Sequence, residues 1–171
     1  MKSRLFLSLA VAAALLIGVV IGAPAAGATA AKPCSSSGLV IWAGEEPGGG
    51  AAGSVYYRIE FTNLSGSSCT VAGYPKVSAV DLHGRRIGAA ATIEPAKEAP
   101  SVKLAPGDTA TATLRIVEAL NYPTARCAPT TAAGLRIMMP GGSGAKVAPL
   151  AFETCAKPGS KTLSVGPVTS G

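Results

Sequence analysis

Residues 55–75 constrain the fold of this chain more than any other segment. Between residues 55 and 62, Val55, Tyr57, Ile59 and Phe61 alternate with Tyr56, Arg58, Glu60 and Thr62. Successive side chains of a strand point to opposite faces, so the alternation predicts a half-buried β-strand with its apolar face on a core. Residues 63–68 are small turn formers, and the segment from Cys69 to Gly73-Tyr74-Pro75 resumes the strand pattern.

Similar patterns recur along the rest of the chain. They predict strands at residues 39–42, 77–82, 86–93, 102–104, 109–116, 135–139, 145–150 and 161–168. Hairpin turns are expected at residues 81–85 and 105–108, with Gly84 in the left-handed conformation of the first. Loops are expected at residues 45–53, 94–100, 121–133 and 141–144. About eight short strands separated by turns predict an all-β fold, an immunoglobulin-like antiparallel β-sandwich, with a barrel as the main alternative.

The N-terminus has the layout of an export signal. Lys2 and Arg4 precede an apolar run, and small residues follow it. We expect residues 1–30 to be a signal peptide cleaved after Ala30, which leaves residues 31–171 as a single domain. The alternative is an uncleaved membrane anchor, because the apolar run reaches Ala23 and approaches the length of a membrane span. Cys34 lacks the preceding box of a lipoprotein, so lipidation is not expected.

Four cysteines lie beyond the signal: Cys34, Cys69, Cys127 and Cys155. An even number in an exported chain indicates disulfides, and three pairings are open. Sequential pairing is the simplest, and each bridge would then contribute roughly 3–4 kcal/mol in the chain-entropy model. A metal site is not expected, because no CxxC pair is present and His83 is the only histidine.

The charge does not indicate a nucleic-acid-binding protein. The formal net charge is +6, but apart from Arg85-Arg86 the basic residues of the expected mature chain are scattered. Nucleic-acid surfaces use clustered basic residues, often with aromatic residues among them. We therefore expect a solvated positive surface and no nucleic-acid partner.

The residues that could carry catalysis lie in segments with ordinary structural explanations. His83 falls in a predicted turn, and Gly141-x-Ser143 lacks the strand-to-helix setting of a nucleophile elbow. The pairs Glu45-Glu46 and Glu94/Glu98 fall in predicted loops, where nothing would raise the pKa of one carboxyl. We expect no enzyme activity and no cofactor.

Three further signals have structural explanations. Met138 and Met139 are adjacent, so on a strand they would face opposite sides, one of them toward the core. Tyr74 is expected to pack in the core or to bond a turn. Asn63-Leu64-Ser65 matches the glycosylation sequon, and we interpret the match as chance.

Several short motifs occur in a characteristic order. They are Cys34, Tyr57-Arg58-Ile59-Glu60-Phe61-Thr62-Asn63, Cys69-Thr70-Val71-x-Gly73-Tyr74-Pro75, Asp81-x-x-Gly84, Leu104-x-Pro106-Gly107-Asp108, Cys127 and Cys155. In this pattern the chain resembles the actinobacterial DUF4232 domain, found in secreted proteins and lipoproteins. The resemblance implies a β-sandwich at the cell envelope, with no established activity and no catalytic residues to transfer. Many relatives are lipid-anchored, whereas this chain lacks the motif for that anchor.

These observations lead to two hypotheses about function. The first is an extracellular or cell-envelope module, non-catalytic and monomeric, that binds a protein or a cell-wall polymer through residues 45–53 and 121–133. Membrane contact would then require an uncleaved N-terminal segment. The alternative is a secreted protease inhibitor that presents the loop around Cys127, with Pro123 and Pro129 nearby.

Overall fold

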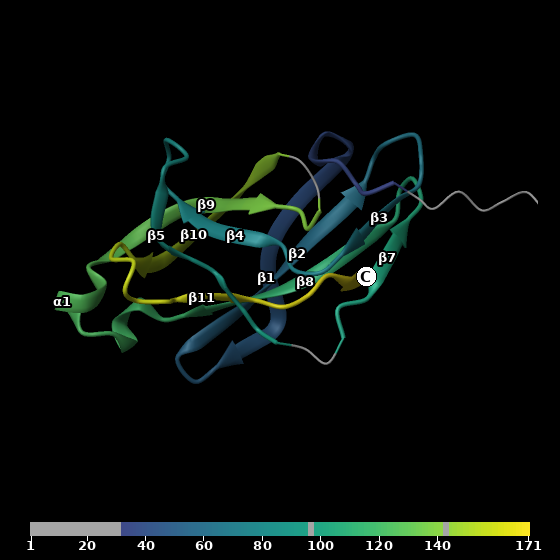
Figure 1. Ribbon diagram of the computed structural model, residues 1–171. Helices are drawn as coiled ribbons and strands as arrows, with labels where there is room; N and C mark the ends of the chain where they lie inside the picture. Colours follow the sequence, from purple (N-terminus) through teal and green to yellow (C-terminus); the bar gives the residue numbers. More distant parts are fainter. Residues whose placement is uncertain (1–31, 96–97, 142–143) are drawn as a thin grey trace, which may run out of the picture.

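The computed structural model describes residues 32–95, 98–141 and 144–171, which fold as an all-β sandwich (Figure 1). The larger sheet has the order β1 (Leu39–Ala51), β2 (Ser54–Asn63), β8 (Thr109–Val117), β11 (Leu163–Val165) and β6 (Thr92–Ile93), with β12 (Thr169–Ser170) also paired to β8. The smaller sheet has the order β10 (Ala145–Cys155), β9 (Pro129–Met138), β4 (Lys76–Val80) and β5 (Arg86–Ala90). Strands β3 (Cys69–Ala72) and β7 (Ser101–Leu104) form a two-stranded sheet.

The strand pairs are antiparallel except for β11 with β6, which is parallel. Short helical turns are confined to η1 (Ser36–Gly38), η2 (Ala119–Asn121) and α1 (Thr124–Cys127) in the part of the chain that the structure describes. The predicted all-β antiparallel sandwich is therefore confirmed. The strands are more numerous than expected, because the predicted strand at residues 86–93 divides into β5 and β6, and β12 follows the last predicted strand, of which β11 is the paired part.

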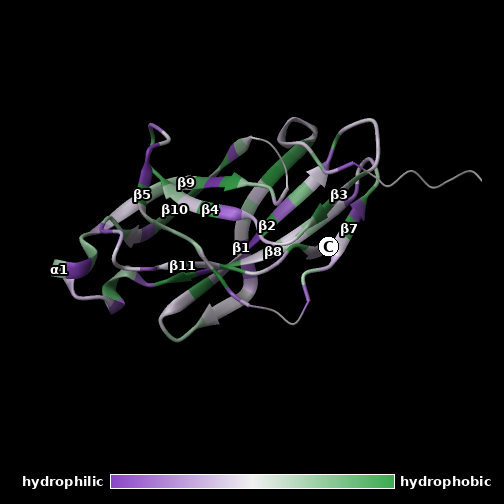
Figure 2. Cartoon of the chain, in the orientation of Figure 1, coloured by the Kyte–Doolittle hydropathy of each residue, from purple (hydrophilic) through white to green (hydrophobic). Residues whose placement is uncertain are grey.

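The alternation that predicted the central strands positions them as expected. Ile59 and Phe61 of β2 are fully buried, and β8 buries every second residue from Ala110 to Ile116. Strand β2 pairs with β8 through Ile59 opposite Ala112 and Phe61 opposite Ala110, which places the two apolar faces together. Figure 2 shows hydrophobic and hydrophilic residues alternating along β2.

One core lies between the sheets. The larger sheet contributes Ile59, Phe61 and Leu114, the smaller sheet contributes Val77, Leu135 and Ile137, and the two-stranded sheet contributes Val71 and Leu104. All eight side chains are almost completely removed from solvent. Burial of each stabilises the fold by roughly 1.5–3 kcal/mol relative to an exposed position.

The loop predicted at residues 45–53 was wrong. Strand β1 continues to Ala51, and pairing with β2 resumes at Gly50 opposite Val55 after an irregularity that begins at Glu45. The glycines here allow a bulge rather than a free loop: a Cβ on Gly49 would lie 3.0 Å from the carbonyl oxygen of Tyr56. Gly53, with φ of +74°, closes the hairpin.

The long loop predicted at residues 121–133 was also wrong. This segment contains the end of η2, all of α1 and the start of β9. Its two prolines occupy positions that proline tolerates, because Pro123 immediately precedes α1 and Pro129 is the first residue of β9. Ala128, with φ of 49°, turns the chain from the helix into the strand.

The disulfides join Cys34 to Cys69 and Cys127 to Cys155, which is the sequential pairing. They lie at opposite ends of the sandwich, since α1 and β3 occupy opposite ends of Figure 1. Disulfides of this kind are typical of proteins in oxidising compartments. The predicted signal peptide lies outside the described residues, and no helix within those residues is long and apolar enough to cross a membrane.

Candidate functional site

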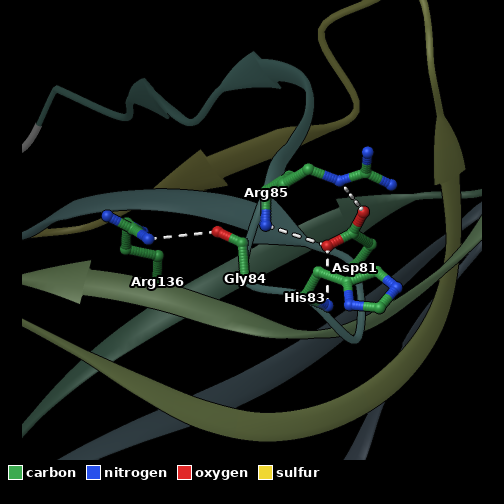
Figure 3. Close-up of polar contacts among 5 residues, drawn as sticks. All are labelled: Asp81, His83, Gly84, Arg85 and Arg136. Atoms are coloured by element: carbon green, nitrogen blue, oxygen red, sulfur yellow. Dashed lines mark hydrogen bonds and ion pairs between the residues drawn. The ribbon is translucent and has the colours of Figure 1, made fainter.

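The predicted hairpin turn at residues 81–85 is confirmed, and it explains the position of His83. One carboxylate oxygen of Asp81 accepts hydrogen bonds from the backbone N–H groups of His83 and Arg85, at 2.9 and 2.8 Å (Figure 3). The other oxygen lies 2.8 Å from Nε of Arg85. Gly84 takes the left-handed conformation, and its carbonyl oxygen accepts a hydrogen bond from Arg136. His83 is an exposed residue of a turn organised by Asp81.

The turn has a predictable pH dependence. The backbone N–H of Arg85 and its guanidinium, with the N–H of His83, hold the pKa of Asp81 below its ordinary value. A lowered folded-state pKa means stabilisation that is present above the ordinary carboxyl pKa and lost as pH falls through the folded value. We expect the thermal midpoints of the wild type and Asp81→Asn to differ at neutral pH and to converge in acid. A difference that stays constant in a pH series of melting curves would contradict this role.

The acidic residues considered as pairs in the sequence have separate surroundings. Glu46 lies 3.8 Å from Arg58, and Glu94 accepts a hydrogen bond from Ser164. Glu98 is exposed. Among the described residues, no three His, Cys, Asp or Glu side chains lie close enough together to hold a metal ion. Ser143 lies outside the described residues.

The structure also places the two adjacent methionines, Tyr74 and the asparagine of the sequon. Met139 is buried and Met138 is exposed, so the prediction that they face opposite sides is confirmed. Tyr74 is half-buried. Asn63, the first residue of the sequon, is fully buried, and its amide nitrogen donates to the carbonyl oxygens of Ser67 and Leu104. Asn63 is therefore a structural residue, and the folded protein conceals it from modification.

The two segments predicted as binding loops do meet at one end of the sandwich. The carbonyl oxygen of Gly53 accepts hydrogen bonds from the N–H of Glu118, at 3.0 Å, and from the side chain of Asn121, at 2.9 Å. The hydroxyl of Tyr122 donates to the carbonyl oxygen of Lys161. These bonds fix the end of the sandwich, and Leu120 projects from it with 84% of its surface exposed.

A different surface combines an exposed aromatic side chain with hydrogen-bonding groups on a regular sheet. Residues directly opposite each other in paired strands point to the same face. Strands β1, β2 and β8 are neighbours in the larger sheet (Figure 1). The strand register therefore brings side chains from all three together on the outer face of that sheet. We call this surface the platform face, and it consists of Val40, Trp42, Arg58, Glu60, Thr111 and Thr113.

The ring of Trp42 packs over the strand that carries it. The indole covers Gly44, since a Cβ built on Gly44 would lie 1.9 Å from an indole ring atom. Only glycine leaves room for the ring at this position, two residues further along the same face of β1. One side of the indole therefore rests on the backbone while 51% of the residue surface is exposed. The result is an aromatic surface that is supported by the strand and open to solvent.

The polar neighbours of Trp42 form rows across the sheet. Trp42 lies opposite Glu60, and Glu60 lies opposite Thr111. In the next row Gly44 lies opposite Arg58, and Arg58 opposite Thr113. Nε of Arg58 lies 3.2 Å from the Glu60 carboxylate, an ionic contact without the alignment of a hydrogen bond. Sequence reasoning missed this site because only the strand register shows which side chains share a row.

An open hollow of about 710 Å³ lies beside the Cys34–Cys69 disulfide. Its walls include Ser35, Asn63 and Ser65. The hydroxyl of Ser65 donates to Asn63, and the hydroxyl of Ser35 bonds that of Ser37. These side chains are already hydrogen-bonded within the protein, so the hollow is a weaker candidate binding site than the platform face.

The fold and the disulfides define a small all-β module with one disulfide at each end and the platform face on its larger sheet. A family model described as "Domain of unknown function (DUF4232)" matches residues 34–169. The chain belongs to this family, as its motif order predicted. No curated protein matches the chain.

Proposed function

We propose that this protein is an exported, non-catalytic binding module that holds a cell-wall component or an envelope protein on its platform face. The observation that carries the proposal is Trp42, a large aromatic residue that is half-exposed with its ring over Gly44. Exposed tryptophan on a rigid support is characteristic of binding surfaces, because it offers contact area with little loss of conformational entropy. The two disulfides support a location outside the reducing cytosol.

The proposed binding surface lies on the larger sheet and not on residues 45–53 and 121–133, where the sequence predicted it. The end formed by the β1–β2 turn and η2 is held by bonds within the protein, and the apolar residue that it presents is the aliphatic Leu120. The protease-inhibitor alternative has less support. Proteases bind extended segments, whereas the chain before Cys127 is a helical turn.

Retention on envelope material tests the proposal. The oxidised, exported protein should be retained by an envelope fraction of the organism that encodes it, and Trp42→Ala should be released. Leu120→Ala is the matched control, since it removes a more exposed apolar side chain from a different surface. Retention of Trp42→Ala at the wild-type level would rule out the platform face, and failure of the wild type to be retained would rule out the proposal.

A further inference from the structure

The shape and chemistry of the platform face select among the possible ligands. Resting on the proposed function, we infer that the ligand is a neutral glycan whose sugar ring stacks on the indole of Trp42. A pyranose ring has an apolar face of C–H bonds and a rim of hydroxyl groups. It therefore matches a flat aromatic surface that is bordered by hydrogen-bonding side chains.

The apolar part of this match is provided by the Trp42 and Gly44 pair. The six-membered ring of the indole covers the backbone of Gly44, while 51% of the Trp42 surface remains exposed on the solvent side. A sugar can approach that side without displacing any part of the protein. The Gly44 backbone limits the positions open to the ring, so we expect binding to cost little additional conformational entropy.

The polar part is provided by the rows beside the indole. Glu60 and Thr111 continue the Trp42 row onto β2 and β8, and Arg58 and Thr113 lie in the adjacent row. Neighbouring strands are about 4.8 Å apart, so these side chains extend roughly 10 Å from β1. That distance accommodates a second sugar, whose hydroxyls can both donate to the carboxylate and accept from the guanidinium and the threonines.

The charges of the platform face favour a neutral glycan over an anionic one. The Arg58 guanidinium lies between two carboxylates, 3.2 Å from Glu60 and 3.8 Å from Glu46. In the adjoining row, Arg115 donates to the hydroxyl of Ser54. The charge of Arg58, the one basic residue of the platform face, is thus balanced by carboxylates, whereas the partner of Arg115 is a neutral hydroxyl. A polyanion would require clustered and unpaired basic groups.

The same surface is poorly suited to a protein partner. A stable protein interface buries about 800 Å² on each side around a largely apolar centre. Here threonines and ion-paired side chains surround Trp42, and Val40 is its exposed apolar neighbour on β1. The other aromatic residue on this side of β2, Tyr56, is half-buried beyond Arg58. Sugars need only one stacked aromatic ring together with many hydrogen bonds.

The chain provides its own probe, because Trp42 is its only tryptophan. We would titrate the oxidised, exported protein with cello-, chito-, malto- and mannohexaose, and follow tryptophan emission and its quenching by acrylamide. At least one neutral hexaose should shift the emission with saturation and protect the indole from acrylamide. Heparin, as a polyanion, should do neither at physiological salt.

Three variants, studied by calorimetry with the hexaose that binds, locate the site. Trp42→Ala should weaken binding by about tenfold or more, and Trp42→Phe should recover part of the loss because a ring remains. Gly44→Ala keeps the indole but pushes it off the strand, so it should also weaken binding. Leu120→Ala should bind like the wild type. Circular dichroism would verify that each variant is folded.

The outcomes separate this inference from the proposed function. If no hexaose binds while envelope retention still depends on Trp42, the glycan is wrong and the binding module stands. Binding that survives Trp42→Ala unchanged would overturn the site, and stronger protection by heparin would overturn the choice of a neutral ligand. If retention on the envelope and hexaose binding both fail, both proposals fall.

Discussion

Reduction of both disulfides is expected to lower the free energy of unfolding by about 7 kcal/mol in the chain-entropy model. Cys34–Cys69 closes a separation of 35 residues and Cys127–Cys155 one of 28, so the two contributions should be similar. Small domains are stable by about 5–15 kcal/mol in total. The reduced protein should therefore be close to unfolding, or unfolded, under conditions in which the oxidised protein is folded.

Urea unfolding of the oxidised and reduced protein, followed by circular dichroism, measures this difference. Two further variants, each with one cysteine pair replaced by alanines, measure how much of the lost free energy of unfolding belongs to each disulfide. We expect the Cys127→Ala/Cys155→Ala variant to open η2 and α1 first, because that bridge anchors a small separate cluster with Ala119 and Tyr122. A midpoint unchanged by reduction would mean that the core alone holds the sandwich together.

Asn63→Ala is expected to destabilise the fold by about 3 kcal/mol, a large effect for one polar residue. The Asn63 side chain accepts hydrogen bonds from the N–H and hydroxyl of Ser65, and donates to Ser67 and Leu104 at 3.0 and 3.1 Å. The backbone of Asn63 also hydrogen-bonds to Gly107 and Asp108 in the turn at residues 105–108. One buried side chain thus joins the end of β2 to the following loop and to the end of β7.

Asn63→Asp sharpens the test, because it preserves size while replacing the donor with a carboxylate that faces two carbonyl oxygens. We expect Asn63→Asp to be less stable than Asn63→Ala at neutral pH, and to recover in acid as the carboxyl gains a proton. Asn121→Ala is the matched control, since that exposed asparagine makes one hydrogen bond to Gly53. Equal urea midpoints for Asn63→Ala and Asn121→Ala would contradict the structural role of Asn63.

The strands with clear alternation were predicted correctly from sequence, and the two segments rich in glycine or proline were not. In β2 and β8 the period of two is a direct consequence of one buried and one exposed face. Residues 45–53 and 121–133 lack that signal. Glycine in β1 permits a bulge beside β2, and proline fits immediately before a helix or at the first position of a strand. Composition alone does not distinguish these uses from a loop.

The candidate site was less predictable than the fold. In sequence, Trp42 was one apolar residue of a short predicted strand, and nothing singled out Gly44. Their contact depends on the side chain of one lying over the backbone of the other. Asn63 likewise appeared as part of a chance sequon, because its partner Leu104 lies 41 positions further along the chain. Local sequence does not encode such contacts visibly.

The amino-acid sequence by itself established the β class, the main strands and the family, and it indicated disulfides. Alternation and turn residues are local signals, and the number of cysteines is a matter of composition, so none of them depends on the tertiary structure. The tertiary structure decided which cysteines pair, which glycines are bulges and which side chains share a row of the sheet. The physical reason is register. A shift of one residue would turn Trp42 and Arg58 inward, and only the packing of the whole core holds them at the surface.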